Sequence, residues 1–343
     1  MRRYSTLSPA EIDANTPHRS SAFNDYYFSI TDPIGERQTV FIEGNDLLKR
    51  FQSLKPNQTI RIGETGFGTG LTFLVACDQF LKHAPDNVRL QWVSTERFPM
   101  VKSQITKALG ALALNSDLKT LSGTLCDVWP QLIPTCHRRL FCAGRITLDL
   151  YFGDSTDVFS DVSGVIDAWC LDGFSPDRNP DSWTPKLFQA IADHSHHHTT
   201  LSTFTAARVV RDGLSAVGFS VSKVPGFGGK RERLVARFNG SQKPMIWAPK
   251  QHLGETHRIA IVGGGLAGAW TAHALAQRGF PVTVFEQFSP ASGASGNAQG
   301  ITYAKLSIEA TPNSLIQMQA LAHLDNWFQL LPNDVWQHTG VLL

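Results

Sequence analysis

The chain has 343 residues, a formal net charge of +2 and 42% hydrophobic residues. This length exceeds the roughly 100 to 200 residues of a typical domain, so we expect two domains. No apolar run approaches the roughly 20 residues of a membrane span, and the first residues lack the apolar core of a signal peptide, which predicts a cytoplasmic protein. The five cysteines form no Cys-x-x-Cys pair, which argues against a disulfide framework or a zinc finger. So small a net charge leaves nucleic-acid binding open.

Strands and helices alternate over the first 240 residues. Residues 23–41 are aromatic and predict a small hairpin or irregular cap rather than a helix. Hydrophobic periodicity then predicts strands at 59–63, 90–95, 146–152, 167–171 and 200–204, and helices at 45–54, 69–82, 101–114, 185–192 and 206–217. Residues 219–224 and 231–238 alternate like an antiparallel pair. This order predicts an α/β fold, a doubly wound, Rossmann-like sheet with an antiparallel terminal hairpin.

A glycine-rich turn follows the first of these strands. Gly66, Gly68 and Gly70 permit positive φ and close approach of a ligand, and Thr69 can cap the next helix. The turn lacks the Lys-Ser/Thr ending of a P-loop, and Glu64 would repel a phosphate. The turn therefore favours a cofactor with cationic or hydroxyl groups, such as S-adenosylmethionine, over a nucleoside triphosphate.

Acidic residues follow three further strands. Glu96 stands about where a ribose-binding carboxylate is expected, and Asp154 and Asp172 end the next two strands. Carboxyl ends of parallel strands form one rim of the sheet, where doubly wound folds bind ligands. Asp172 enters a proline-rich loop, and a rigid loop can hold a reacting group in place before the substrate arrives. Asp154 has the alternative role of a helix N-cap.

A second strand–turn–helix unit follows residues 239–257, which lack periodicity and are rich in Pro, Gln, Lys and Gly. Residues 258–262 predict a strand, 269–278 a helix and 282–285 a second strand. Gly263, Gly265 and Gly268 form a G-x-G-x-x-G turn, and Glu286 ends the second strand. We expect domains at 1–240 and 258–343 joined by a linker at 241–257, the second being an incomplete part of a flavin domain.

Three other groups of residues invite a chemical interpretation. The histidines at 194 and 196–198 stand between a predicted helix and strand without a Cys or carboxylate at ligand spacing, so we expect no metal site. Cys170 alternates away from Asp172 along its strand, which favours packing over nucleophilic catalysis. Lys230 and Arg231 follow a glycine-rich turn, and the sequence leaves open whether they contact phosphates or solvent.

Five tracts of the chain resemble the family of bifunctional tRNA 5-methylaminomethyl-2-thiouridine biosynthesis proteins, called MnmC. They are Phe-Asn-Asp-Tyr-Tyr-Phe-Ser (23–29), Gly-Glu-Thr-Gly-Phe-Gly-Thr-Gly-Leu-Thr-Phe-Leu (63–74), Ser-Thr-Glu-Arg (94–97), Asp-Ala-Trp-Cys-Leu-Asp-Gly-Phe-Ser-Pro-Asp-Arg-Asn-Pro (167–180) and Gly-Phe-Gly-Gly-Lys-Arg-Glu (226–232). The resemblance implies a class I methyltransferase domain followed by the start of a FAD-dependent oxidase. In that family the oxidase removes a carboxymethyl group from the wobble uridine, and the methyltransferase then methylates the resulting amine.

The resemblance also implies roles for individual residues. Asp172 would lie against the acceptor amine as the catalytic residue, either as a base or only to position the amine. The residues that would hold S-adenosylmethionine are Glu64, Gly66, Gly68, Gly70, Glu96 and Asp154. FAD would bind Gly263, Gly265, Gly268 and Glu286, and the substrate would contact Phe174, Pro176, Asn179, Lys230 and Arg231. The partner would be a tRNA anticodon loop, and we expect a monomer that binds no membrane.

Two other functions remain open at this point. The G-x-G-x-x-G unit would suit a flavin-dependent amine oxidoreductase whose first half is an accessory module. A tRNA-binding protein without catalytic activity would bind the anticodon loop but leave S-adenosylmethionine unchanged.

Overall fold

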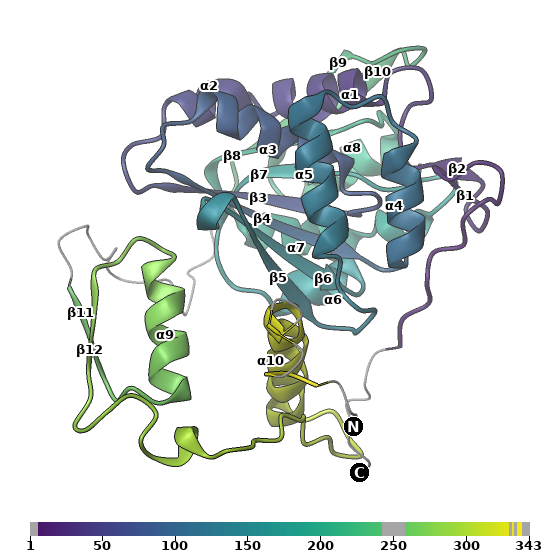
Figure 1. The fold of residues 1–343 in the computed structure, drawn as a ribbon. Coiled ribbons are helices and arrows are strands. Elements are labelled where there is room, and N and C mark those ends of the chain that lie inside the picture. The colour runs from purple at the N-terminus through teal and green to yellow at the C-terminus, as the bar shows by residue number, and fades with distance from the viewer. Residues whose placement is uncertain (1–5, 242–257, 329–330, 333–334, 338–343) are drawn as a thin grey trace.

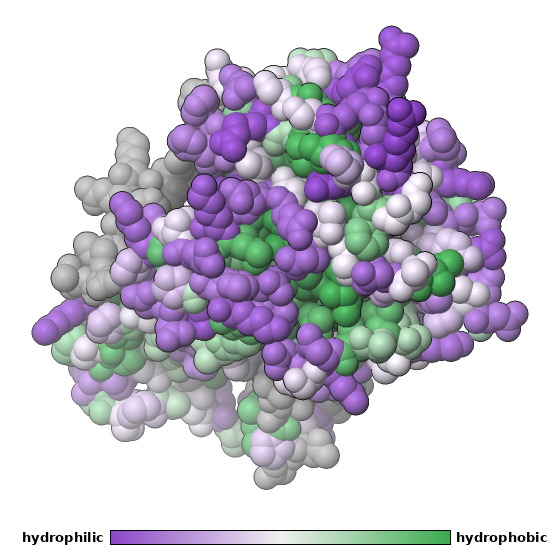
Figure 2. Space-filling view, turned by 90° about the horizontal axis from the view of Figure 1, so that it is seen from above, coloured by the Kyte–Doolittle hydropathy of each residue, from purple (hydrophilic) through white to green (hydrophobic). Residues whose placement is uncertain are grey.

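The computed structural model describes residues 6–241, 258–328, 331–332 and 335–337. Most of the secondary structure belongs to one large mixed sheet with helices on both faces, and a smaller unit of two strands and two helices follows it (Figure 1). Within these residues no helix is both long and apolar enough to cross a membrane. Seen from the side of α1 and α2, the surface is mainly hydrophilic, with hydrophobic patches between the polar side chains (Figure 2).

The large sheet has eight strands in the order β5-β6-β4-β3-β7-β8-β10-β9. Five central strands are parallel, and the strands at both ends of the order pair antiparallel with their neighbours. The strands are β3 (Thr59–Thr65), β4 (Arg89–Glu96), β5 (Cys136–Phe141), β6 (Ile146–Phe152), β7 (Ile166–Leu171), β8 (Ser195–Thr203), β9 (Phe219–Pro225) and β10 (Glu232–Phe238). This arrangement confirms the predicted doubly wound sheet and its terminal hairpin.

Two hydrophobic cores cover the two faces of this sheet. Side chains of α2 (Leu47–Gln52), α3 (Leu71–His83), α4 (Lys102–Gly110) and α5 (Ser116–Asp127) form one core, which includes the fully buried Phe73 and Trp92. Side chains of α6 (Ser155–Asp161), α7 (Pro185–Asp193) and α8 (Arg208–Ala216) form the other around Trp169. Neighbouring residues of a strand point to opposite faces, so Ala168 and Trp169 of β7 enter different cores.

The N-terminal region contains more helix than the sequence predicts. A short hairpin is present, in which β1 (Arg19–Ser20) pairs with β2 (Asp25–Tyr26) and each strand has two residues. The expectation of an irregular cap up to residue 41 is wrong, because α1 (Pro33–Arg37) and a π-helix (Gln38–Glu43) follow. Asp32 caps α1 by accepting a hydrogen bond from the Gly35 amide at 2.8 Å. The aromatic residues of this region have a high β propensity, so the sequence pattern did not indicate the capped helix. The structure that such residues adopt depends on what they pack against.

Beyond the N-terminal region, α5, β5 and α6 also have no counterpart in the prediction. β5 carries charged residues such as Arg138 and Arg139, as strands at a sheet edge often do, and so lacks a hydrophobic run. β8 begins at Ser195 rather than at residue 200, so His196, His197 and His198 lie inside the strand instead of before it. These differences extend the sheet without changing its topology at the centre.

The turn after β3 adopts the positive φ angles that its glycines allow, at +84° for Gly66, +56° for Gly68 and +74° for Gly70. Gly70 is the N-cap of α3, so the expectation that Thr69 caps this helix is wrong. A Cβ at Gly66 would lie 2.6 Å from the Asp172 carbonyl oxygen. Glycine at residue 66 therefore lets the turns after β3 and β7 approach each other.

The second unit contains β11 (Ile259–Val262), α9 (Leu266–Ala276), β12 (Val282–Phe285) and α10 (Pro312–Phe328). β11 and β12 pair in parallel with Ile259 opposite Val282, which confirms the expected strand–helix–strand unit. Val262, Leu266 and Phe285 are largely exposed on it. The predicted linker at 241–257 lies outside the described residues apart from Ser241.

Candidate active site

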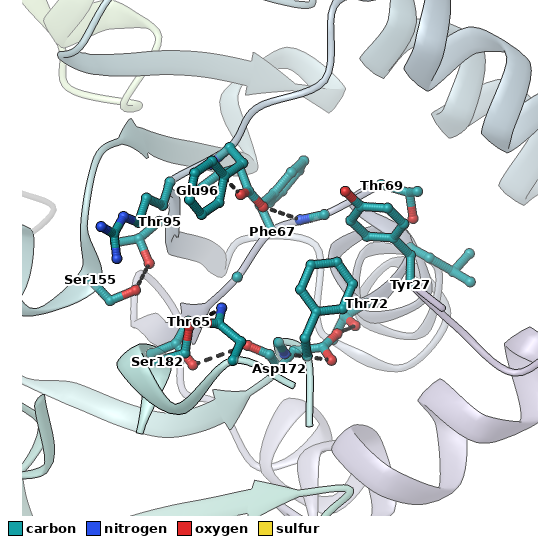
Figure 3. Close-up of a pocket in the computed structure, with 18 of the residues that line it drawn as sticks. Tyr27, Thr65, Phe67, Thr69, Thr72, Thr95, Glu96, Ser155, Asp172 and Ser182 are labelled. Carbon is teal, nitrogen blue, oxygen red and sulfur yellow. Dashed lines mark hydrogen bonds between the residues drawn. The ribbon is translucent and has the colours of Figure 1, made fainter. Parts of the chain in front are cut away.

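A cleft opens at the carboxyl ends of β3, β4 and β7. It encloses about 700 Å³ of empty space including its open mouth. Figure 3 shows Glu96 and Asp172 on opposite sides of this cleft, with Phe67, Thr69 and Tyr27 along its wall. The sequence places all three strand ends at one rim, and the parallel register makes them meet there.

Glu96 binds the glycine turn directly. Its Oε2 atom accepts a hydrogen bond from the Gly68 amide and its Oε1 atom accepts one from the Phe98 amide, both at 2.8 Å. Burial raises the pKa of Glu96 to about 7, against the lowering effect of the Gly68 and Phe98 amides. The carboxylate therefore joins β3 to β4 at the cleft and titrates near neutral pH.

Asp172 lies in the cleft wall with its side chain 13% exposed. Its Oδ2 atom accepts a hydrogen bond from the Thr72 hydroxyl at 3.0 Å, and its Oδ1 atom accepts one from the Gly173 amide at 3.1 Å. The Nη1 atom of Arg37 is 3.3 Å from Oδ1 and 3.2 Å from Oδ2. Burial raises the pKa of Asp172, while Arg37 and the other donors lower it. A buried, largely hydrogen-bonded carboxylate is thus presented to the cleft.

Glu64 does not line the cleft, which corrects the predicted contact with a cofactor. Its carboxyl is fully buried, and Oε2 accepts hydrogen bonds from Trp92 Nε1 at 2.9 Å and Ser94 Oγ at 2.6 Å. Burial, with a contribution from the Asp172 carboxylate, raises the pKa of Glu64 to about 8. Glu64 is therefore a mostly neutral acid that holds β3 to β4.

Asp154 and Gly70 also lie just outside the cleft lining. Asp154 is the N-cap of α6, where its carboxylate accepts a hydrogen bond from the Thr156 amide at 2.9 Å. It also pairs with Arg97 at 3.5 Å, and the neighbouring Ser155 lines the cleft in its place. The alternative role as an N-cap is the observed one, because the side chain is already used within its own turn.

The predicted substrate residues divide into two groups. Phe174 and Asn179 line the cleft, whereas Pro176, Lys230 and Arg231 do not. Lys230 is 3.4 Å from Glu36 Oε1, and its Nζ atom lies 4.4 Å from the ring centroid of Phe204. Lys230 therefore already has partners within the domain, and a contact between it and RNA phosphates stays a prediction.

Phe174 belongs to an aromatic group whose other members were not among the predicted site residues. Phe23 stacks on Phe174 with ring centroids 4.7 Å apart, and Tyr27 meets the edge of Phe174 at 5.0 Å. Phe98 contacts Phe23 from the turn after β4. Tyr26, Tyr27 and Phe98 also line the cleft. The tract 23–29 carries several of these rings, so their clustering was the signal that could have identified them.

The second glycine turn has the local geometry that a dinucleotide cofactor requires. Glu286 Oε2 accepts a hydrogen bond from the Gly264 amide at 2.6 Å, and Ser295 Oγ accepts one from the Leu266 amide at 3.0 Å. A Cβ at Gly268 would lie 1.9 Å from the Gly263 carbonyl oxygen, so only glycine fits there. The Gly264 and Leu266 amides thus already have acceptors within the unit, and a contact between this turn and a phosphate stays a prediction.

The clustered histidines have ordinary protein partners. The ring nitrogens of His194 lie 2.7 Å from the carbonyl oxygens of Gly164 and Phe159, and His196 Nε2 lies 3.0 Å from Asp167 Oδ1. In the described part of the chain, no three His, Cys, Asp or Glu residues are grouped so that they could hold a metal ion. Cys170 is fully buried, as expected of a packing residue.

Comparison with protein families divides the chain as its two glycine turns do. Residues 116–239 match a family described as S-adenosyl-L-methionine-dependent methyltransferase, and residues 258–343 match the FAD-dependent oxidoreductase family. These matches confirm the predicted combination of S-adenosylmethionine and FAD.

Curated relatives align with nearly the whole chain. The tRNA 5-methylaminomethyl-2-thiouridine biosynthesis bifunctional proteins MnmC of Chromohalobacter salexigens and a Marinomonas species are 40% and 41% identical over 98% and 99% of it. The chain spans about half the length of these relatives, at 49% and 52%. Among solved structures, MnmC2 of Aquifex aeolicus matches with a TM-score of 0.52 and 22% identity, over 71% of this chain and 75% of that one. This likeness confirms the fold.

Proposed function

Over the half of their length that it spans, this chain belongs with the MnmC proteins, and we propose that it is a tRNA-modifying methyltransferase. The acceptor is the aminomethyl group of a wobble uridine, which becomes a methylaminomethyl group. The methyl donor is S-adenosylmethionine. The observation that carries this proposal is the placement of Asp172 and Glu96 on opposite sides of a cleft that the glycine turn also lines.

The cleft suits the proposed methyl donor. Gly66 and Gly68 give close access to the turn backbone, and Glu96 offers carboxylate oxygens to ribose hydroxyls at the end of β4. When bound, S-adenosylmethionine supplies an electrophilic methyl group on a positively charged sulfur. The carboxyl groups of Glu96 and Asp172 and the rings of Tyr27 and Phe174 line the cleft and would favour such a positive charge.

Asp172 would handle the acceptor amine. An alkylamine is mostly protonated at neutral pH, so its lone pair must be freed before it can attack the methyl carbon. The new C–N bond forms while the S–C bond breaks, and one proton leaves the nitrogen. Asp172 takes this proton, or water takes it before binding while Asp172 only orients the amine through a charge-assisted hydrogen bond.

The aromatic rings of the cleft support an unpaired base as the substrate. Anticodon-loop bases can be splayed out and stacked on aromatic side chains, at a lower cost than extrusion from a duplex. Phe174 and Tyr27 line the same cleft as Asp172 and contact each other, and Phe23 stacks on Phe174 from outside the lining. We therefore propose the anticodon loop of tRNA as the partner. We also propose that the enzyme is a cytoplasmic monomer.

The same proposal divides the chain into two domains. The division at 1–240 and 258–343, with a linker at 241–257, is supported by the separate sheets and by the two family matches.

A FAD-dependent oxidase acting on the same amine is the second candidate function. The Glu286–Gly264 hydrogen bond and the close-packed Gly268 favour it. Purified chain with visible flavin absorption and amine oxidation would support it.

Labelled S-adenosylmethionine tests the primary function. The full chain is incubated with tRNA that carries 5-aminomethyl-2-thiouridine, and the nucleosides are then analysed. Label in 5-methylaminomethyl-2-thiouridine is the expected result. Binding of the tRNA without consumption of S-adenosylmethionine would instead identify a non-catalytic tRNA-binding protein.

A further inference from the structure

Arg37 is the cationic partner of Asp172, and the sequence analysis did not single it out. It ends α1, it is 3% exposed, and it lines the cleft. One of its terminal nitrogens lies within 3.3 Å of both Asp172 carboxylate oxygens, while the other donates to the Tyr27 carbonyl oxygen. The same second nitrogen lies 4.0 Å from Glu36 Oε2, and Glu36 in turn lies 3.4 Å from Lys230. The guanidinium is thus held between the reacting carboxylate, Glu36 and the aromatic wall.

This pairing leaves Asp172 little capacity for further hydrogen bonds. An ionised carboxylate offers about four acceptor positions. The Gly173 amide and Arg37 approach Oδ1, and the Thr72 hydroxyl and Arg37 approach Oδ2. A substrate amine approaching from the cleft must therefore share a carboxylate whose charge a buried cation already balances.

The charge balance decides which form of the amine the site prefers. An unpaired carboxylate in a poorly solvated cleft favours an ammonium ion, which has no lone pair for methyl transfer. A guanidinium within 3.5 Å of the same carboxylate opposes a second cation. The other titratable groups that act on Asp172 are acids, so none of them supplies this opposition: Glu36 from α1, Glu64 from β3, Glu96 from β4 and Cys170 from β7.

We propose that Arg37 is a positioning residue for the methyl acceptor, which keeps Asp172 ionised and cancels its charge so that the site accepts the neutral amine. The inference rests on the proposed methyl transfer. It agrees with the lowering effect of Arg37 on the pKa of Asp172. Arg37 itself transfers no proton, because a guanidinium stays charged in proteins.

The pH dependence of methyl transfer tests this role. We compare the full chain with Arg37→Met and Arg37→Lys, using an anticodon stem-loop that carries 5-aminomethyl-2-thiouridine. Loss of the cation favours the ammonium ion and the protonated Asp172, so both effects move the acid limb of kcat to higher pH. We expect a shift of about one unit or more for Arg37→Met, with activity recovering at high pH, and a smaller shift for Arg37→Lys.

Arg138→Met is the matched control. Arg138 forms a charged pair with Asp149 at 2.6 Å on β5 and β6, and neither residue lines the cleft. In the control variant, the acid limb of kcat should keep its wild-type midpoint pH. An equal fractional loss of kcat at every pH in Arg37→Met, or the same shift in the control, would show that Arg37 only supports the fold and would overturn the proposal.

Carboxyl NMR separates this inference from the proposed function. With ¹³C-labelled aspartate and Asp172→Asn to assign the signal, the pKa of Asp172 should rise in Arg37→Met and stay unchanged in Arg138→Met. An unchanged pKa in Arg37→Met overturns the inference even where the wild-type chain methylates tRNA. Failure of the wild-type chain to methylate tRNA removes the proposed function, and a rise in the pKa would then still establish the coupling of the two residues.

Discussion

The Gly68 amide donates a hydrogen bond to Glu96 Oε2 at 2.8 Å, so the end of β4 holds the glycine turn that follows β3. The same carboxyl accepts the Phe98 amide through its other oxygen. A single side chain thereby sets the shape of the cleft and offers its remaining acceptor positions to a ligand.

S-adenosylmethionine binding should depend on the ionisation of Glu96. Its pKa is about 7, and the ionised form accepts hydrogen bonds from ribose hydroxyls better than the neutral acid. Affinity should therefore rise as pH increases from 6 to 8 and level off above that range. Isothermal titration calorimetry on Glu96→Gln should show at least a tenfold weaker Kd, near 1.4 kcal/mol, and a flat pH profile. Retention of the wild-type profile by this variant would contradict the assignment, and Asp181→Asn, on the exposed rim, is the control.

Asp172→Asn should impair turnover far more than cofactor binding. The amide keeps the size of the side chain but removes the charge that orients the amine and accepts its proton, an effect of roughly 10² to 10⁴ in rate. Single-turnover kinetics and calorimetry measure the two quantities separately. Equal losses in turnover and in S-adenosylmethionine affinity would identify Asp172 as a binding or folding residue instead.

Glu64 should make the folded chain less stable as pH rises. Its pKa is about 8 in the folded state and near 4.5 when unfolded, so folding retains a proton that the unfolded chain releases between these values. The stabilisation is complete below pH 4.5 and decreases toward pH 8, by up to about 1.4 kcal/mol per pH unit. Glu96 and Asp172, whose pKa values are also raised, add a slope of the same sign. Urea denaturation of Glu64→Gln should therefore show a smaller slope, whereas the exposed Glu11→Gln should keep the wild-type slope. The same slope in both variants would exclude Glu64 as its source.

Binding of the anticodon stem-loop should weaken as salt concentration rises, because phosphate contacts release counterions. Arg231 is exposed, so Arg231→Ala should lower the slope of log K against log salt by about one. Lys230→Ala should lower this slope by less, since Lys230 already forms an ion pair with Glu36. Lys55→Ala, before the amino end of β3 and away from the cleft rim, is the control in fluorescence anisotropy titrations. An affinity independent of salt would argue against tRNA as the partner.

The order of elements around both glycine turns follows from the hydrophobic pattern of the chain. Alternating hydrophobic runs predicted the central parallel strands, and the parallel arrangement alone brought Gly66, Glu96 and Asp172 to one rim. Such patterns are local and periodic, so they can be recognised without tertiary contacts. The polar edge strand β5 and the capped α1 lack a hydrophobic pattern of their own and were missed for that reason.

The contacts of each acid near the rim depend on packing between elements that are far apart in the sequence. Glu64 and Glu96 end neighbouring strands, yet Glu64 faces Trp92 and Ser94 in the interior, whereas Glu96 faces the cleft. The pairing of Arg37 with Asp172 joins residues 135 positions apart in the chain. Charge interactions depend on distance and burial, and here these follow from the packing of α1 against α3 rather than from spacing along the sequence.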